Sequence, residues 1–173
     1  MCPFPDETKE DGHLRHRIET YALDDADAAI LRELGADARI ARAELARRVG
    51  LSAPSVGERV RRLEDAGVIV GYHARIDPRR LGYALAILIR ARPSPGRMGD
   101  MADAIRKTSQ IVRCERVSGE DCFIAWAHVR DVAEMEAVID RLVPFGATNT
   151  SLVQSEPFAE RMVDLRPGPE PSL

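Results

Sequence analysis

Residues 42–67 read RAELARRVGLSAPSVGERVRRLEDAG, and this stretch decides the fold of the N-terminal half. A short helix is predicted over Arg42–Val49, and Gly50 supplies the turn that follows it. Ser52 then caps the next helix, with Pro54 in its first turn, where a missing N–H costs nothing. Apolar side chains recur at helical spacing in both helices, at Leu45, Ala46 and Val49 and then at Val56, Val60 and Leu63.

Another helix precedes this pair, with Asp24 as its N-cap and Gly35 at its end. Its apolar stripe consists of Ile30, Leu31 and Leu34. Three short helices with a tight glycine turn between the second and third are typical of a helix-turn-helix. The alternating stretch Val68–Arg75 around Gly71 is predicted to form a small β-wing that leads into a connecting strand.

The second half alternates between strand and helix patterns in the order β-α-β-β-α-β, which is the ferredoxin-like arrangement. The predicted elements are a strand over 83–92, a helix over 98–108, strands over 111–118 and 122–130, a helix over 132–143 and a strand over 148–155. The fold class is therefore α+β, an N-terminal winged helix-turn-helix followed by a ferredoxin-like βαββαβ domain. Trp126 is predicted to lie in the core.

Composition shifts give the domain boundaries. We expect a flexible tail over 1–21, a helix-turn-helix domain over 22–75, a linker over 76–82, a ferredoxin-like domain over 83–158 and a C-terminal tail over 159–173, with residues 166–173 disordered.

The net charge of the whole chain is −3, which by itself would argue against nucleic-acid binding, but charge must be considered segment by segment. Residues 36–75 carry eight arginines against five acids, so the basic excess lies in the helix-turn-helix region. The longest apolar run, Leu81–Ile89, is too short to span a membrane, and the acidic N-terminus does not resemble a secretory signal. We expect a cytoplasmic protein with no membrane partner.

An α-helix fits the major groove of DNA, and its N-terminal residues reach the base edges. Ser55, Arg59 and Arg62 are predicted to face the groove. Glu58 either accepts from cytosine N4 or, as we favour, pairs with Arg62. Contacts to the DNA backbone are predicted for Ser52 at the helix N-terminus, Arg61, Arg47 and Arg48. The alternative is an arginine-rich face that is simply solvated.

The chain resembles the Lrp/AsnC, or feast/famine, family of transcription regulators over about residues 22–158. The resemblance rests on Leu23-Asp24 through Ile30-Leu31, Arg39, Glu44-Leu45-Ala46, Val49-Gly50-Leu51-Ser52, Arg59-Val60, Leu63, Gly67-Val68-Ile69, Asp77-Pro78 and Leu81-Gly82, with Val117 to Glu120 and Thr148 to Ser151 in the second half. It implies a homodimer that pairs its sheets, assembles further into a tetramer or octamer, binds double-stranded DNA and responds to a small-molecule effector.

Three departures from the family pattern stand out. Ala41 replaces the usual Ser or Thr cap of the second helix, which costs roughly 1 kcal/mol. Gly57 lies inside the recognition helix and costs about 1 kcal/mol against alanine, either as a tolerated substitution or to permit close approach to DNA. Glu120, Asp121 and Cys122 follow Gly119 where many relatives have an acid, an aromatic residue and an aspartate.

A free amino acid needs an acid for its ammonium and N–H or hydroxyl donors for its carboxylate. The Gly119-Glu120-Asp121 turn offers both, and the resemblance implies that effectors bind here, between dimers. The predicted effector set is Gly119, Glu120, Asp121, Cys122, Thr148, Thr150 and Ser151. A plain polar hairpin turn is the alternative.

Other functions remain open. The cysteines Cys2, Cys114 and Cys122 lack metal-type spacing, and no nucleophile–base arrangement stands out, so we expect no metal, no cofactor and no enzyme activity. One alternative is a chromatin-organising protein without an effector. A second is a siroheme-decarboxylase-like enzyme on the same scaffold, against which the intact segment from Ser52 to Gly67 argues.

Overall fold

The computed structural model describes residues 21–158 and 161–165. The tail predicted over residues 1–21 lies outside this range except for Tyr21, and so does the disorder predicted for 166–173. The chain forms two units, one made of the residues up to His73 together with the segment from Arg161, the other of Ala74–Glu160. Each unit is described by itself below.

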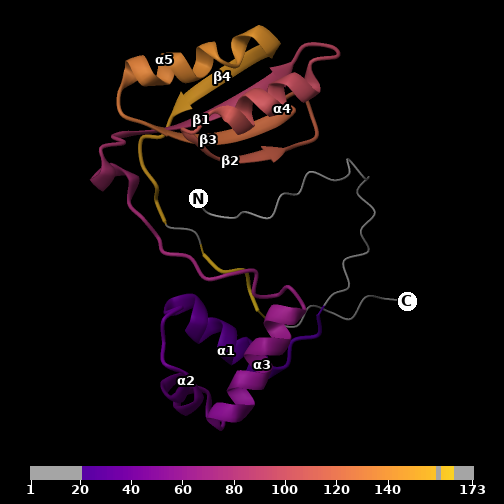
Figure 1. The fold of residues 1–173 in the computed structure, drawn as a ribbon, viewed down its shortest axis with the longest axis vertical. Helices are drawn as coiled ribbons and strands as arrows, with labels where there is room; N and C mark the ends of the chain where they lie inside the picture. The colour runs from indigo at the N-terminus through magenta and orange to yellow at the C-terminus, as the bar shows by residue number, and fades with distance from the viewer. Residues whose placement is uncertain (1–20, 159–160, 166–173) are drawn as a thin grey trace. The chain divides into compact units, whose positions relative to one another are not determined.

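Three helices form the first unit: α1 (Asp25–Ala36), α2 (Arg42–Val49) and α3 (Ala53–Asp65) (Figure 1). The predicted N-caps are confirmed, because the Asp24 carboxylate accepts from the Asp27 amide at 2.7 Å and the Ser52 hydroxyl accepts from the Ser55 amide at 3.3 Å. Ala41 makes no capping bond. The helices pack around a core of Ile30, Leu31, Leu45, Ala46, Val56 and Leu63.

The segment predicted to be a β-wing, Val68–Arg75, contains no strand. Its first two amides instead close the end of α3, since Val68 and Ile69 both donate to the Leu63 carbonyl, at 2.9 and 3.0 Å. The prediction of a β-wing over Val68–Arg75 is therefore not met, because no described strand pairs with this segment.

The segment 161–165 belongs to the helical unit rather than behaving as a free tail. Leu165 is half-buried against the core of α1 to α3. The end of Met162 lies against Gly35 in the last turn of α1, where an added Cβ would come within 2.0 Å of its terminal methyl. The segment 161–165 thus completes the surface of the helical unit.

We expect Leu165→Ala to destabilise the helical unit by about 1 kcal/mol, less than for a fully buried leucine, because Leu165 is only partly covered. A thermal melt followed by circular dichroism measures the change. Val163→Ala is the matched control, since Val163 is exposed and its truncation should leave the melt unchanged. Equal melting temperatures for both variants would show that the segment adds nothing to this unit.

The second unit is a four-stranded antiparallel sheet in the order β2-β3-β1-β4. Its elements are β1 (Leu85–Pro93), α4 (Met98–Lys107), β2 (Ile111–Arg116), β3 (Phe123–Val129), α5 (Val132–Asp140) and β4 (Gly146–Leu152), with short 3-10 turns at Pro78–Leu81 and Val143–Phe145. This order confirms the ferredoxin-like arrangement. The predicted helix over 132–143 ends early, because the chain passes into the 3-10 turn.

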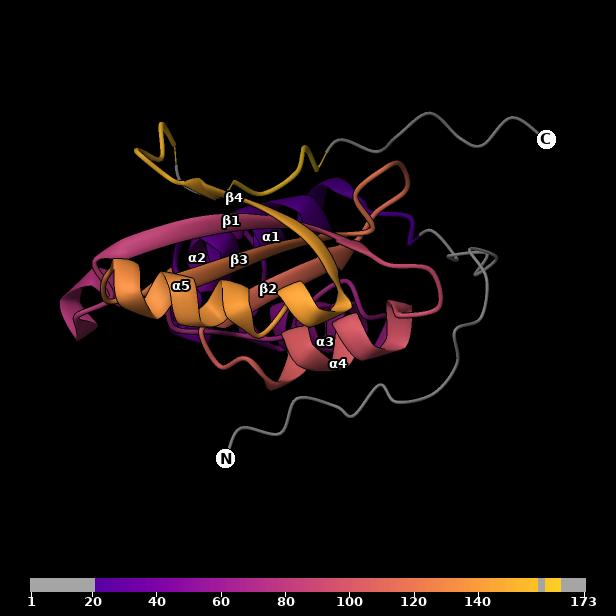
Figure 2. The same ribbon diagram turned by 90° about the horizontal axis from the view of Figure 1, so that it is seen from above.

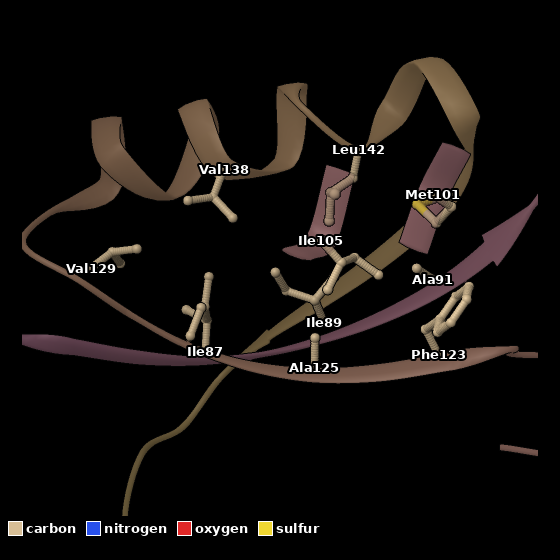
Figure 3. Packing of buried hydrophobic residues seen from close by; sticks show 11 residues of the cluster. Ile87, Ile89, Ala91, Met101, Ile105, Phe123, Ala125, Val129, Val138 and Leu142 are labelled. Carbon is tan, nitrogen blue, oxygen red and sulfur yellow. The ribbon is translucent and has the colours of Figure 1, made fainter. Parts of the chain in front are cut away.

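Both helices cover the same face of the sheet (Figure 2). Alternate residues of β1 and β3 point toward the two helices (Figure 3): Ile87, Ile89, Ala91, Phe123, Ala125, Ala127 and Val129. They pack against Met101 and Ile105 of α4, Val138 of α5 and Leu142 just after α5.

Trp126 corrects the sequence prediction. It lies between buried Ala125 and Ala127 on β3, so the strand's two-residue period turns its ring to the opposite face. The Arg113 guanidinium stacks over that ring at 4.6 Å. Within this unit, α4 and α5 both lie on the other face, so we call the face of Trp126 the open face of the sheet.

Candidate functional site

The exposed side of α3 carries two arginines. The side chain of Arg61 is 78% exposed and that of Arg62 is 51% exposed. Glu58 is also exposed, and the predicted Glu58–Arg62 ion pair does not form; Arg62 instead lies 3.8 Å from Asp27. Ser55 lies at the start of the same helix and is half-buried.

Arg59 does not share this exposed side, contrary to the sequence prediction. Its Nη1 donates to Asp24 at 2.6 Å and to Asp27 at 2.7 Å, and its side chain is 24% exposed. Asp27 itself is 2% exposed and also accepts from the Tyr21 hydroxyl at 3.4 Å. Arg59 therefore ties α3 to the start of α1, because a buried carboxylate needs a paired cation.

The pKa of Asp24 is lowered from its ordinary value, first by the hydrogen bond from the Asp27 amide and then by Arg59. One carboxylate thus caps α1 and binds α3. This cluster of Asp24, Asp27 and Arg59 sets the position of the recognition helix.

Arg47 and Arg48, predicted to contact the DNA backbone, both bind Glu44. Arg47 approaches Glu44 to 2.7 Å and Arg48 to 2.8 Å, and Arg48 also reaches Glu33 at 2.9 Å. The hydrogen bonds from Arg47 and Arg48 lower the pKa of Glu44 from 4.5 to about 2. Glu44 therefore neutralises part of the positive charge on α2.

Glu44→Gln is expected to raise DNA affinity, because it removes the negative charge that both arginines face. The slope of log affinity against log salt should steepen by up to about one. Fluorescence anisotropy with duplex DNA at several salt concentrations measures both quantities. An unchanged slope would mean that Arg47 and Arg48 lie away from the phosphates.

The helical unit should also lose stability in acid. Because the folded pKa of Glu44 is depressed, its contribution is present above the unfolded value of 4.5 and disappears as the pH falls toward 2. Thermal melts between about pH 6 and pH 3 should show a shallower decline for Glu44→Gln than for the unaltered protein. Parallel declines would contradict this assignment.

In the second unit, the turn between β2 and β3 is closed by two backbone hydrogen bonds. The Val117 amide donates to the Cys122 carbonyl at 3.0 Å, and the Cys122 amide donates to the Ala91 carbonyl at 3.0 Å. Gly119 has a φ of +112°, which only glycine adopts readily. This geometry holds the turn against β1 at one end of the sheet.

The two acids of this turn differ. Glu120 pairs with Arg92 of β1 at 2.7 Å, whereas Asp121 makes no hydrogen bond or ion pair within the described chain. Cys122 packs its side chain against the core between sheet and helices. Of the predicted acidic groups, Asp121 is thus the one left available to a cation.

The hydroxyls predicted on the last strand do not form one set. Thr148 and Thr150 lie opposite Ala91 and Ile89, so they share the face that the helices cover, whereas Ser151 lies opposite Leu88 on the open face. The Thr150 hydroxyl is buried without a hydrogen-bond partner among the described residues. Only Thr148 lies at the same end of the sheet as the turn, with β1 between them.

A surface hollow of about 480 Å³ lies elsewhere, against α4 and the turn that follows α5. Asp103, Lys107 and Arg141 line it, and none of the predicted effector residues does. This hollow is therefore separate from the Gly119–Cys122 turn.

Comparison with known proteins gives the same two parts. The model for winged helix-turn-helix DNA-binding domains matches residues 23–70, and the model for the Lrp/AsnC ligand binding domain matches residues 86–163. The HTH-type transcriptional regulator LrpA of Mycobacterium tuberculosis is 37% identical over 122 residues, which are 70% of this chain and 81% of that relative.

Solved structures agree. The LrpC structure from Bacillus subtilis has a TM-score of 0.76 at 30% identity and covers 80% of this chain and 99% of its own. The feast or famine regulatory protein of Mycobacterium tuberculosis, solved with L-methionine, has a TM-score of 0.76 at 32% identity, with 82% and 99% covered.

A helix-turn-helix joined to a ferredoxin-like ligand-binding domain defines a DNA-binding transcription regulator. The chain belongs to the Lrp/AsnC family of these regulators.

Proposed function

We propose that this regulator binds DNA through the exposed side of α3 and responds to an amino acid held at the Gly119–Cys122 turn. The exposures of the arginines on α3 support binding to DNA through this side. Arg61 and Arg62 are exposed, whereas Arg59 forms ion pairs with Asp24 and Asp27 of the same unit. Ser52 and Ser55 at the helix start add an N-terminus that favours phosphate.

The effector proposal rests on the unpaired carboxylate of Asp121 beside the amides of a glycine turn. These groups suit the ammonium and carboxylate of an amino acid. The relative from Mycobacterium tuberculosis was solved with L-methionine, which supports an amino acid as the ligand class. Because the turn lies at the surface of one chain, we infer that a second chain completes the site.

We also propose a homodimer formed through the open face of the sheet, with further assembly to a tetramer or octamer. Leu88, Ile124 and Trp126 give this face a half-buried apolar centre, on the side of the sheet opposite α4 and α5. Two DNA-binding units would then reach half-sites about one helical turn apart. The chain works in the cytoplasm, where its DNA lies, by binding rather than catalysis.

Arg61→Ala and Arg62→Ala test the DNA-binding face. Each should weaken binding to duplex DNA and reduce the salt slope by about one per bound unit, while the melting temperature of Arg61→Ala stays the same. Binding that is unchanged in both variants would exclude this side of α3.

A thermal-shift screen of the twenty amino acids tests the effector. A ligand of the folded state must raise the melting temperature. The shift should disappear in Asp121→Asn and persist in Asp103→Asn, a matched loss of one acid at the separate hollow. If no amino acid shifts the protein or alters its DNA affinity, a chromatin-organising role without an effector is the better description.

A further inference from the structure

We propose that Arg42, at the start of α2, is a further DNA-phosphate contact, and that Gly57 exists in α3 to let its side chain lie across the recognition helix. The inference rests on the proposed DNA-binding face of α3. The sequence left two explanations for Gly57, a tolerated substitution and close approach of the helix to DNA. Packing of the Arg42 side chain is a third.

The packing around Gly57 supports it. A Cβ at this position would lie 3.3 Å from Nη1 of Arg42, 3.5 Å from its Cζ and 3.6 Å from its Cδ. The guanidinium and the end of its stem therefore lie against the bare backbone of α3. Gly57 has no positive φ, so its backbone conformation does not require glycine. A glycine inside a helix lowers helix stability, and here the space it leaves is filled by a cation.

The charges on α3 show why that cation matters. The helix has three arginines and three acids, so it brings no net positive charge to DNA. Arg59 is held by Asp24 and Asp27, and Arg61 lies 3.6 Å from Asp65. A cation from a neighbouring helix would therefore add positive charge beside Arg61 and Arg62.

Arg42 is suited to supply it. Its side chain is exposed, and it forms no ion pair with any described residue, unlike Arg47 and Arg48 on the same helix. Glu64 lies seven residues, or about two helical turns, after Gly57 on α3. Its carboxylate accepts a hydrogen bond from the Tyr72 hydroxyl at 2.9 Å and forms no ion pair with Arg42. The guanidinium thus flanks the recognition helix, where a helix-turn-helix meets the sugar-phosphate backbone.

A double-mutant cycle with Arg42→Gln and Gly57→Ala tests the proposal, with binding to a random-sequence duplex followed by anisotropy over a range of salt. Arg42→Gln should weaken binding about threefold and lower the salt slope by about one per bound unit. Gly57→Ala should weaken binding while it keeps or raises the melting temperature, because alanine favours the helix but displaces the guanidinium. The double variant should bind no more weakly than Arg42→Gln alone.

Arg32→Gln is the matched control, since it removes the same charge from an exposed position of α1; its salt slope should not change. Additive losses in the cycle would overturn the proposal and show that Gly57 acts by its own approach to DNA. Unchanged binding in Arg42→Gln, with Arg61→Ala still impaired, would overturn this inference alone. If both variants bind normally, the DNA-binding face itself is wrong.

Discussion

Arg59→Met is expected to lower the free energy of unfolding of the helical unit by about 2–3 kcal/mol, on the order of 10 °C in melting temperature. Methionine keeps the apolar stem but removes the cation that faces Asp27, whose side chain is 2% exposed. This loss of stability is small for a broken buried ion pair, because two groups remain near the Asp27 carboxylate. Arg62 lies 3.8 Å from it and the Tyr21 hydroxyl lies 3.4 Å from it. Thermal unfolding measures the loss.

Arg61→Ala is the matched control two residues along the same helix. It removes an exposed arginine, so stability should change by less than about 0.5 kcal/mol while DNA binding weakens. The two variants thus separate support of the recognition helix from contact with DNA. An Arg59→Met protein that melts normally and binds DNA poorly would restore the sequence prediction that Arg59 enters the groove.

Gly146→Ala is expected to disrupt the start of β4. A Cβ there would lie 2.1 Å from the Arg92 carbonyl oxygen and 2.7 Å from Cα of Pro93, both of which are backbone atoms of the paired strand. Neither can move aside as a side chain can, so β4 must separate from β1 at this end. We expect a loss of about 2–3 kcal/mol, seen in urea or thermal unfolding of the sheet domain.

Gly99→Ala provides the comparison in the same domain. Gly99 lies in α4 with nothing within 4 Å of an added Cβ, so the substitution should leave stability equal or slightly higher. Equal melting temperatures for Gly146→Ala and Gly99→Ala would contradict a close approach of β1 to Gly146.

The helices, their caps and the βαββαβ order could be predicted because each rests on local signals. The caps at Asp24 and Ser52 and the alternation along β3 need only neighbouring residues. Arg59 was assigned to the wrong side because it was grouped with the other arginines. Its spacing carried the correct signal: it follows Val56 by three and precedes Leu63 by four, and both of these are buried.

The remaining errors concern contacts between distant segments. No local pattern reveals the close approach at Gly146, because its neighbour is the backbone of Arg92, more than fifty positions earlier. The prediction of a core Trp126 is wrong because its place in the alternation of β3 turns it away from the helices. The hydroxyls of β4 were grouped by proximity in sequence, and the two-residue period of a strand divides them between faces.

The half-buried Leu165 also changes how the molecule is connected. The chain leaves the DNA-binding unit after His73 and returns to it at Arg161, so the sensing domain is an insertion with two covalent attachments. A protease that cut only near residue 75 would break the covalent chain between the two units, and the noncovalent packing of the segment from Arg161 against the helices would be their remaining described link. A DNA-binding fragment that stopped at residue 73 would lack a piece of its own surface.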